Sequence, residues 1–188
     1  MSTPTLSPLR TSLLTLSLLA LPLFAAAAPA QVRLVVDLSA RKLYGYSNGE
    51  LVRTYDVAIG TKSHPTPTGS FGISRIIWNP GWNPPDREWA RDEIPREPGD
   101  PANPMRGVKL IFSAPYYYIH GTNAPSSIGE AASHGCIRMT QSDAESLAQW
   151  VQNAGGAGRS AEWYREVRGS HDTREVGLPD PVPLVIRG

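Results

Sequence analysis

The chemistry of this chain is concentrated in one stretch that holds its only cysteine, Cys136, and two of its four histidines, His120 and His134. A thiol is a useful nucleophile as its thiolate, and a nearby imidazole can take the proton. Residues 110–119 are apolar and aromatic, which indicates a strand, and residues 121–133 are mostly small and polar, which indicates a loop. We therefore expect His120 at a strand end and Cys136 on a loop that faces it.

The spacing in this stretch is specific. His-Gly-Thr-Asn runs from His120 to Asn123, and after a loop Ser-His-Gly-Cys-Ile-Arg runs from Ser133 to Arg138. The combined pattern resembles the L,D-transpeptidase catalytic domain (YkuD-type, ErfK/YbiS/YcfS/YnhG-like), and the resemblance covers roughly residues 34–186. It implies that the cysteine is the nucleophile and that the first histidine is its base.

The residues around this pair receive roles in the same way. The resemblance assigns the third position of a triad to the backbone carbonyl of Gly121, which would fix the imidazole's tautomer. Backbone N–H groups around Gly135 and Cys136 are the natural candidates for an oxyanion hole. His134 and Ser133 would orient the loop by hydrogen bonds. The residues expected to bind substrate are Arg138, Tyr118, Asn123 and Trp82.

The resemblance also implies a reaction on peptidoglycan stem peptides. Cys136 would attack the amide between the L-configured centre of a diamino acid and the terminal D-alanine, and a thioester would form. An amine of a neighbouring stem peptide, or a lysine of a wall-anchored protein, would then form a cross-link, whereas water would give L,D-carboxypeptidase activity. Carbapenem-type β-lactams would acylate the same thiol, and neither a cofactor nor a metal is expected.

Three other interpretations are open at this point. His120, His134 and Cys136 carry atoms that could bind zinc, although a fourth ligand is not evident. The domain could be a non-catalytic cell-wall binding module, which would predict that the cysteine or a histidine is lost. The thiol could be buried and inert, as free cysteines often are, but glycines and histidines surround it.

The remaining sequence predicts a single mainly β domain, with mixed sandwich- or barrel-like sheets and one or two flanking helices. Asn48-Gly49 is a strong hairpin signal. A helix capped by residues 142–145 and ended by Gly155-Gly156 should follow the cysteine loop, because its apolar residues recur at helical spacing. A second helix is expected at residues 159–168. Residues 182–186 should form a closing strand whose proline favours a sheet edge.

Residues 78–104 hold three tryptophans, several prolines and alternating charges, with no sustained hydrophobic period. We interpret this segment as a wall or lid of a substrate groove, or alternatively as tryptophans that cap the core. Within residues 116–118, three consecutive tyrosines, at least one ring should line the groove and one should pack inward. His64 is expected to be a solvated loop histidine.

Composition limits the classes of function. The chain has 188 residues, which is enough for one domain. Its net charge of +1 shows no excess of basic residues of the kind that binds nucleic acid. A single cysteine excludes an internal disulfide framework.

Residues 1–30 read as a signal peptide, which leaves residues 31–188 as the catalytic domain. Arg10 supplies a positive charge, residues 13–24 are apolar, and small residues precede a cleavage site after Ala30. The apolar stretch is shorter than the roughly 20 residues of a membrane span, and Pro22 interrupts it, so stable membrane insertion is the less favoured reading. The protein is expected to be extracytoplasmic, and periplasmic in a cell with an outer membrane.

Overall fold

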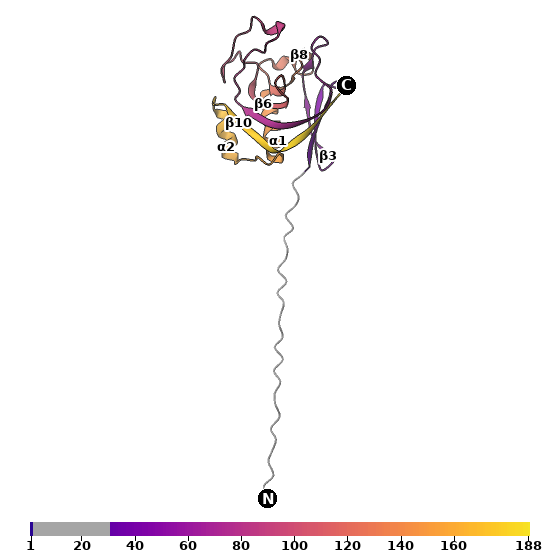
Figure 1. Ribbon diagram of the computed structural model, residues 1–188, viewed down its shortest axis with the longest axis vertical. Coiled ribbons are helices and arrows are strands. Elements are labelled where there is room, and N and C mark those ends of the chain that lie inside the picture. The colour runs from indigo at the N-terminus through magenta and orange to yellow at the C-terminus, as the bar shows by residue number, and fades with distance from the viewer. Residues whose placement is uncertain (2–30) are drawn as a thin grey trace.

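The computed structural model describes Met1 and residues 31–188, which form a strongly curved sheet with helices against it (Figure 1). The predicted signal peptide lies outside the described residues, apart from Met1. The strands are β1 (Val32–Asp37), β2 (Lys42–Ser47), β3 (Glu50–Asp56), β4 (Ile59–Gly60), β5 (Gly69–Trp78), β6 (Arg106–Ser113), β7 (Tyr117–Gly121), β8 (Ala131–Ser133), β9 (Ile137–Met139) and β10 (Arg174–Arg187). The helices are η1 (Glu88–Ala90), η2 (Pro125–Ser127), α1 (Gln141–Ala154) and α2 (Ala161–Gly169). No helix in this part of the chain has the length and apolarity needed to cross a bilayer.

Eight strands form one mixed sheet in the order β3-β2-β1-β10-β5-β6-β7-β9, and β4 pairs with β8 in a small second sheet. The large sheet curls until its two edges approach each other. Arg138 in β9, at one edge, forms an antiparallel bridge with Ala58, which lies two residues beyond the end of β3 at the other edge. The prediction of a mainly β, barrel-like domain with two helices is confirmed.

The core lies between the concave side of the sheet and α1. Alternate residues of the strands are buried there, as expected for strands with one face turned inward. The predicted apolar face of α1 is confirmed, because Ala144, Leu147, Ala148 and Val151 are fully buried. They pack in the same cluster as Leu110 of β6 and other strand residues. Helix α1 therefore packs against β6 and β7 from the core side of the sheet.

The start of α1 differs from the prediction. Its N-cap is Thr140, whose Oγ1 accepts a hydrogen bond from the Asp143 backbone N–H at 3.2 Å and donates to the Asp143 carboxylate at 2.7 Å. The predicted cap at Ser142 is therefore wrong by two residues, because a Thr-x-x-Asp pattern does the capping. Helix α2 begins after Ser160, whose Oγ accepts from the Trp163 N–H at 3.2 Å, and the prediction of a second helix is confirmed.

The predicted edge position of the last strand is wrong. Strand β10 lies inside the sheet, paired in parallel with β1 and antiparallel with β5. Its prolines fall where the ladders are interrupted or begin. Pro179 and Pro181 lie in the irregular stretch between Gly177 and Val182, and Pro183 comes one residue before pairing with β1 begins at Leu184. The hairpin at Asn48-Gly49 is confirmed, and both residues have the positive φ that such turns need, 51° and 88°.

Candidate active site

Two parallel strands place the predicted catalytic residues. Strands β7 and β9 pair with Ile119 opposite Ile137 and His120 opposite Arg138. Because side chains alternate along a strand, the two isoleucines point into the core, where both are fully buried, and the neighbouring positions point to the other face. His120 and Arg138 therefore share that face with Cys136, which directly precedes β9.

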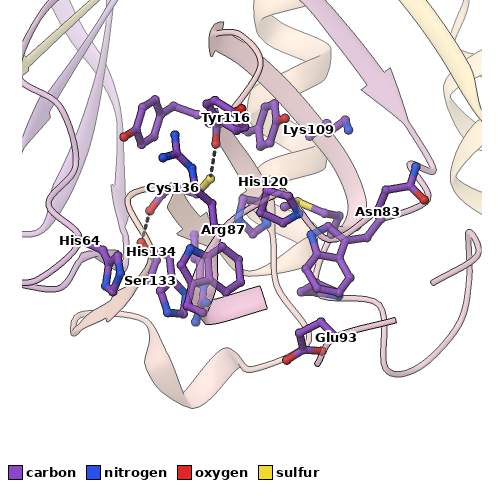
Figure 2. Close-up of a pocket in the computed structure, with 18 of the residues that line it drawn as sticks. His64, Asn83, Arg87, Glu93, Lys109, Tyr116, His120, Ser133, His134 and Cys136 are labelled. Atoms are coloured by element: carbon purple, nitrogen blue, oxygen red, sulfur yellow. Dashed lines mark hydrogen bonds between the residues drawn. The ribbon is translucent and has the colours of Figure 1, made fainter. Parts of the chain in front are cut away.

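This face is the floor of a large cavity of about 1090 Å³, which we call the thiol pocket. Residues 79–104, which we call the roof segment, form much of the opposite wall. Figure 2 shows Cys136 and His120 turned into the same hollow, with side chains of the roof segment in front of them. The cavity is at the upper end of the usual size for small-molecule sites, so it has room for a peptide.

His120 is held by the backbone that follows it. Its side chain is 2% exposed, and Nδ1 lies 2.9 Å from the carbonyl oxygen of Gly121. A carbonyl can only accept a hydrogen bond, so Nδ1 carries the proton and Nε2 is left as a base. Gly121 has no room for a side chain, because a Cβ would lie 2.3 Å from the carbonyl oxygen of Arg106.

Burial lowers the pKa of His120 to about 4. The carbonyls of Gly121 and Pro104 act in the opposite direction, and the charges of Arg138 and Lys109 lower the pKa further. The imidazole is therefore neutral at neutral pH.

The thiol of Cys136 is half-buried and donates a hydrogen bond to the carbonyl oxygen of Tyr116 at 3.4 Å. The surrounding protein removes water from the sulfur and raises its pKa to about 11, while a backbone hydrogen bond from Tyr118 and the charges of Arg138 and Lys109 oppose that shift. The resting pair is therefore a neutral thiol and a neutral imidazole, not a preformed thiolate and imidazolium.

Ser133 fastens the loop that carries the thiol. Its Oγ donates to the Cys136 carbonyl oxygen at 2.6 Å and accepts from the Gly135 N–H at 3.1 Å. Gly135 has a φ of 106°, and a Cβ there would lie 2.6 Å from a ring carbon of Tyr117. The bond to Ser133 occupies the Gly135 N–H, one of the two donors that the predicted oxyanion hole would use.

The ring of His134 is held by contacts with two other rings. Its imidazole stacks on Trp89 of the roof segment, with centroids 3.9 Å apart and an interplanar angle of 6°. The edge of His64 meets it at 4.7 Å. In the described residues the His134 ring makes no hydrogen bond, so the expected mode of orientation is wrong. The prediction of a solvated His64 is also wrong, because the ring is half-buried in the pocket wall.

The three tryptophans of residues 78–104 combine both interpretations. Trp82 and Trp89 line the pocket, whereas Trp78 ends β5 in the core and donates from Nε1 to Gln152 at 2.9 Å. The segment is held across its width by Trp82 and Arg96, whose backbones exchange two hydrogen bonds of 2.8 Å.

The expected substrate-binding residues all line the thiol pocket. Arg138 is half-buried on the floor, and the hydroxyl of Tyr118 donates to the carbonyl of Pro115. Asn123 donates from Nδ2 to the carbonyl oxygen of Ala102 at 3.2 Å and so connects the floor to the roof segment. Trp82, the fourth of these residues, lines the cavity from the roof segment.

The family follows from comparison with known proteins. The model of the L,D-transpeptidase catalytic domain, YkuD, matches residues 31–181. This chain belongs to the YkuD family. A relative named L,D-transpeptidase YkuD from Bacillus licheniformis is 38% identical over 121 residues, which cover 64% of this chain and 61% of that protein. The Escherichia coli relative named L,D-transpeptidase ErfK/SrfK is 34% identical over 122 residues, covering 61% of this chain and 39% of that protein.

Solved structures share the YkuD fold. L,D-transpeptidase 3 from Mycobacterium tuberculosis superposes with a TM-score of 0.53 at 16% identity, covering 85% of this chain and 62% of that one. The same enzyme in complex with a faropenem-derived adduct gives a TM-score of 0.53 at 18% identity, with 85% and 61% covered. This chain thus spans less than two thirds of the length of these proteins.

Sequence reasoning assigned no site role to Lys109 and considered Arg87 only as one of the alternating charges of residues 78–104. Lys109 lies opposite His120 in the register of β6 and β7 and lines the pocket. The signal was a lysine inside the apolar strand at residues 108–112, but its neighbours become visible only once the strands are paired. Arg87 of the roof segment lies 4.5 Å from the ring centroid of Tyr116.

The tyrosines behave as predicted: Tyr116 and Tyr118 face the pocket, and Tyr117, although it also touches the pocket, packs against the core beside Phe112. The zinc alternative finds no support in the geometry, because no three His, Cys, Asp or Glu side chains of the described residues are placed to hold a metal ion.

Proposed function

We propose that this chain is a peptidoglycan L,D-transpeptidase with Cys136 as its nucleophile and His120 as its base. The observation that carries the proposal is the fixed imidazole: Nδ1 is bound to the Gly121 carbonyl, which leaves Nε2 without a proton, and the ring shares its face of the sheet with the thiol. Membership of the YkuD family supports the reaction class.

The acyl donor would be a stem peptide that ends in D-alanine. As the sulfur attacks the amide carbonyl carbon, the thiol proton passes to Nε2 of His120. Collapse of the tetrahedral intermediate breaks the C–N bond, the imidazolium gives its proton to the departing amine of D-alanine, and a thioester remains on Cys136. Because the resting pair is neutral, the proton moves during attack rather than before it.

The developing oxyanion needs hydrogen-bond donors. The N–H of Cys136 is one candidate, and that of Gly135 becomes a second once it leaves the Oγ of Ser133. Each such donor typically contributes about 3 kcal/mol to the transition state. Ser133 would therefore hold the loop at rest and release it when the substrate carbonyl arrives.

The second half of the reaction transfers the acyl group to an amine. A side-chain amine of a neighbouring stem peptide would attack the thioester, and the freed thiolate would recover a proton; a lysine of a wall-anchored protein would react in the same way. Water as acceptor would make the enzyme an L,D-carboxypeptidase. The thiol pocket, at about 1090 Å³, slightly exceeds the usual range for a small-molecule site, which supports a peptide ligand.

The substrate requires an extracytoplasmic site of action, periplasmic where the cell has an outer membrane. The pattern of residues 1–30 supports export, and the YkuD family supports a role in the cell wall. A carbapenem-type β-lactam should acylate Cys136. Support comes from the fold shared with the M. tuberculosis enzyme whose structure includes a faropenem-derived adduct.

The test is incubation of the protein with a purified disaccharide tetrapeptide, with products identified by mass spectrometry. A cross-linked dimer that has lost one D-alanine indicates transpeptidation, and a tripeptide alone indicates hydrolysis. The Cys136→Ala variant should give neither product while keeping the circular dichroism spectrum of the wild type. Turnover near the wild-type rate in that variant would remove Cys136 from the mechanism.

A further inference from the structure

Lys109 lies in the floor of the thiol pocket and has no role in the reaction described so far. It is half-buried in β6, directly opposite His120 of β7. Its ammonium nitrogen lies 4.9 Å from the centroid of the Tyr118 ring. In Figure 2 it appears at the upper right, with His120 and Cys136 between it and His134 at the lower left. The ammonium thus faces the cavity in which the thiol lies.

This ammonium has no acidic partner within 4.0 Å in the described part of the chain. Glu175, on the nearby β10, is bound instead by Arg75 at 3.0 Å. Lys42, by contrast, is paired with Asp56 at 2.6 Å. Burial lowers the pKa of Lys109, and Arg75 lowers it further, while Cys136 and Glu175 act the other way. A desolvated, unpaired cation in a cleft is stabilised when an anion arrives.

The strand order places a cation on each side of the imidazole. Strands β6, β7 and β9 are consecutive, and their registers align Lys109, His120 and Arg138 in one row across the sheet. Both cations act on the same thiol, because each opposes the rise in its pKa. The pocket therefore has two positive groups, separated by one strand.

We propose that Lys109 is a carboxylate-binding residue of this site, and that it receives an anionic group of the acyl donor on the side of His120 opposite to Arg138, the other cation of the row. The identity of the donor rests on the proposed function, whereas the affinity for a carboxylate near the thiol does not. A donor with two carboxylates would bind Lys109 with one and Arg138 with the other, and its scissile carbonyl would lie between these two residues.

The arrangement also couples binding to chemistry. In the free enzyme, Lys109 and Arg138 disfavour a positive charge on His120. Carboxylates bound to both cations would offset that field and make the imidazole a stronger base. The donor would thus promote the proton transfer that its own acylation needs.

Alkylation of Cys136 tests the carboxylate site without any peptidoglycan. The rate constants for iodoacetate and for neutral iodoacetamide are measured at low ionic strength, and their ratio cancels changes in the reactivity of the thiol. In Lys109→Gln the ratio should fall about 5-fold, because a nearby desolvated charge is lost. Lys109→Arg should keep the ratio within about 2-fold, because the charge is retained.

The matched control is Arg75→Gln, which removes the same charge from the adjacent strand but from a residue already paired with Glu175. Its ratio should stay within about 2-fold of the wild type, since a paired surface charge contributes little. An unchanged ratio in Lys109→Gln, with normal thermal unfolding, would overturn the proposal. An equal fall in both variants would also overturn it, because general electrostatic attraction would then explain the effect.

Donor peptides identify the group that Lys109 binds. With the unmodified tetrapeptide, Lys109→Gln should raise KM about 10-fold, and the penalty should vanish for a donor in which the recognised carboxylate is amidated. A penalty that persists with every amidated donor would contradict carboxylate recognition. If no peptide reacts but iodoacetate discrimination still depends on Lys109, the proposed function fails and the carboxylate site stands.

Discussion

The floor and the roof of the thiol pocket are built in different ways. The floor consists of paired strands, and His120 is fixed there by its own strand and by the following carbonyl, with 2% of its surface exposed. The roof segment contacts the floor through Trp89 stacked on His134, the Arg87 guanidinium over the Tyr116 ring and one hydrogen bond between Asn123 and Ala102, and Trp89 is 36% exposed. Residues held by backbone ladders keep one geometry, whereas stacked surface rings can separate at little cost.

This contrast separates two tasks within one cavity. In the proposed mechanism, the groups that move protons and form covalent bonds must be placed within fractions of an ångström, and these groups belong to the floor. Under the proposed function, a polymeric substrate must also be admitted and released, and the roof segment forms the opposite wall of the cavity that receives it. We therefore expect changes at His120 and Cys136 in the floor to act on the chemical step, whereas changes in the roof, like the change proposed at Lys109, should act on substrate binding.

The largest effect is expected at His120. His120→Ala removes the proton acceptor, so the rate of acylation by a tetrapeptide or a carbapenem should fall about 10³-fold. Stopped-flow fluorescence or timed mass spectrometry measures this rate. An acylation rate equal to the wild type would show that the floor does not hold the base.

The same residue should make folding sensitive to acid. An unfolded histidine has a pKa of about 6.5, and that of His120 in the folded protein is about 4, so the unfolded state binds more protons between these values and stability falls as the pH is lowered. The free energy of unfolding should drop by about 2 kcal/mol between pH 7.5 and 5 from this residue alone. Urea unfolding of the wild type and His120→Gln measures the difference. Equal pH dependence in both proteins would mean that His120 is not buried as a neutral group.

The roof should respond differently. Trp89→Ala removes the ring stacked on His134, and we expect KM for the tetrapeptide to rise about 5-fold with a smaller change in kcat, because a stacked pair contributes about 1 kcal/mol. The control is Ile94→Ala, an exposed residue of the same segment that does not line the pocket. A fall in kcat at constant KM would contradict the division between floor and roof.

The smallest effect concerns the support beneath the floor. Thr140→Ala removes the cap of α1 and should lower the free energy of unfolding by about 1 kcal/mol. Ser142→Ala, at the position that the sequence pattern favoured, should change it by less than about 0.5 kcal/mol. Urea unfolding distinguishes the two. A larger loss for Ser142 would restore the predicted cap.

The sequence predicted the parts of this site that depend on local signals. His120 lies near the end of a strand because an aromatic, apolar run stops there, and Cys136 follows a bend that the positive φ of Gly135 permits. Both expectations follow from a few neighbouring residues, as does the hairpin at Asn48-Gly49.

The parts that depend on distant pairing could not be read in the same way. Lys109 becomes a neighbour of His120 only when β6 pairs with β7, and His64 reaches the wall only when its loop meets His134. The internal position of β10 was missed for a related reason. Prolines favour an edge on average, but here they fall at an irregular stretch and at the start of a ladder.

The place of β10 has a consequence for how the protein comes into being. This strand, formed by residues 174–187, is inserted between β1, made at the start of the described chain, and β5. Without β10, strands β1 and β5 lose the partner that they share, and in the described residues the two halves of the sheet are paired only through the Ala58–Arg138 bridge and the β4–β8 pair. We therefore expect the pairing of β10 to be needed before the thiol and the imidazole are held in their final positions.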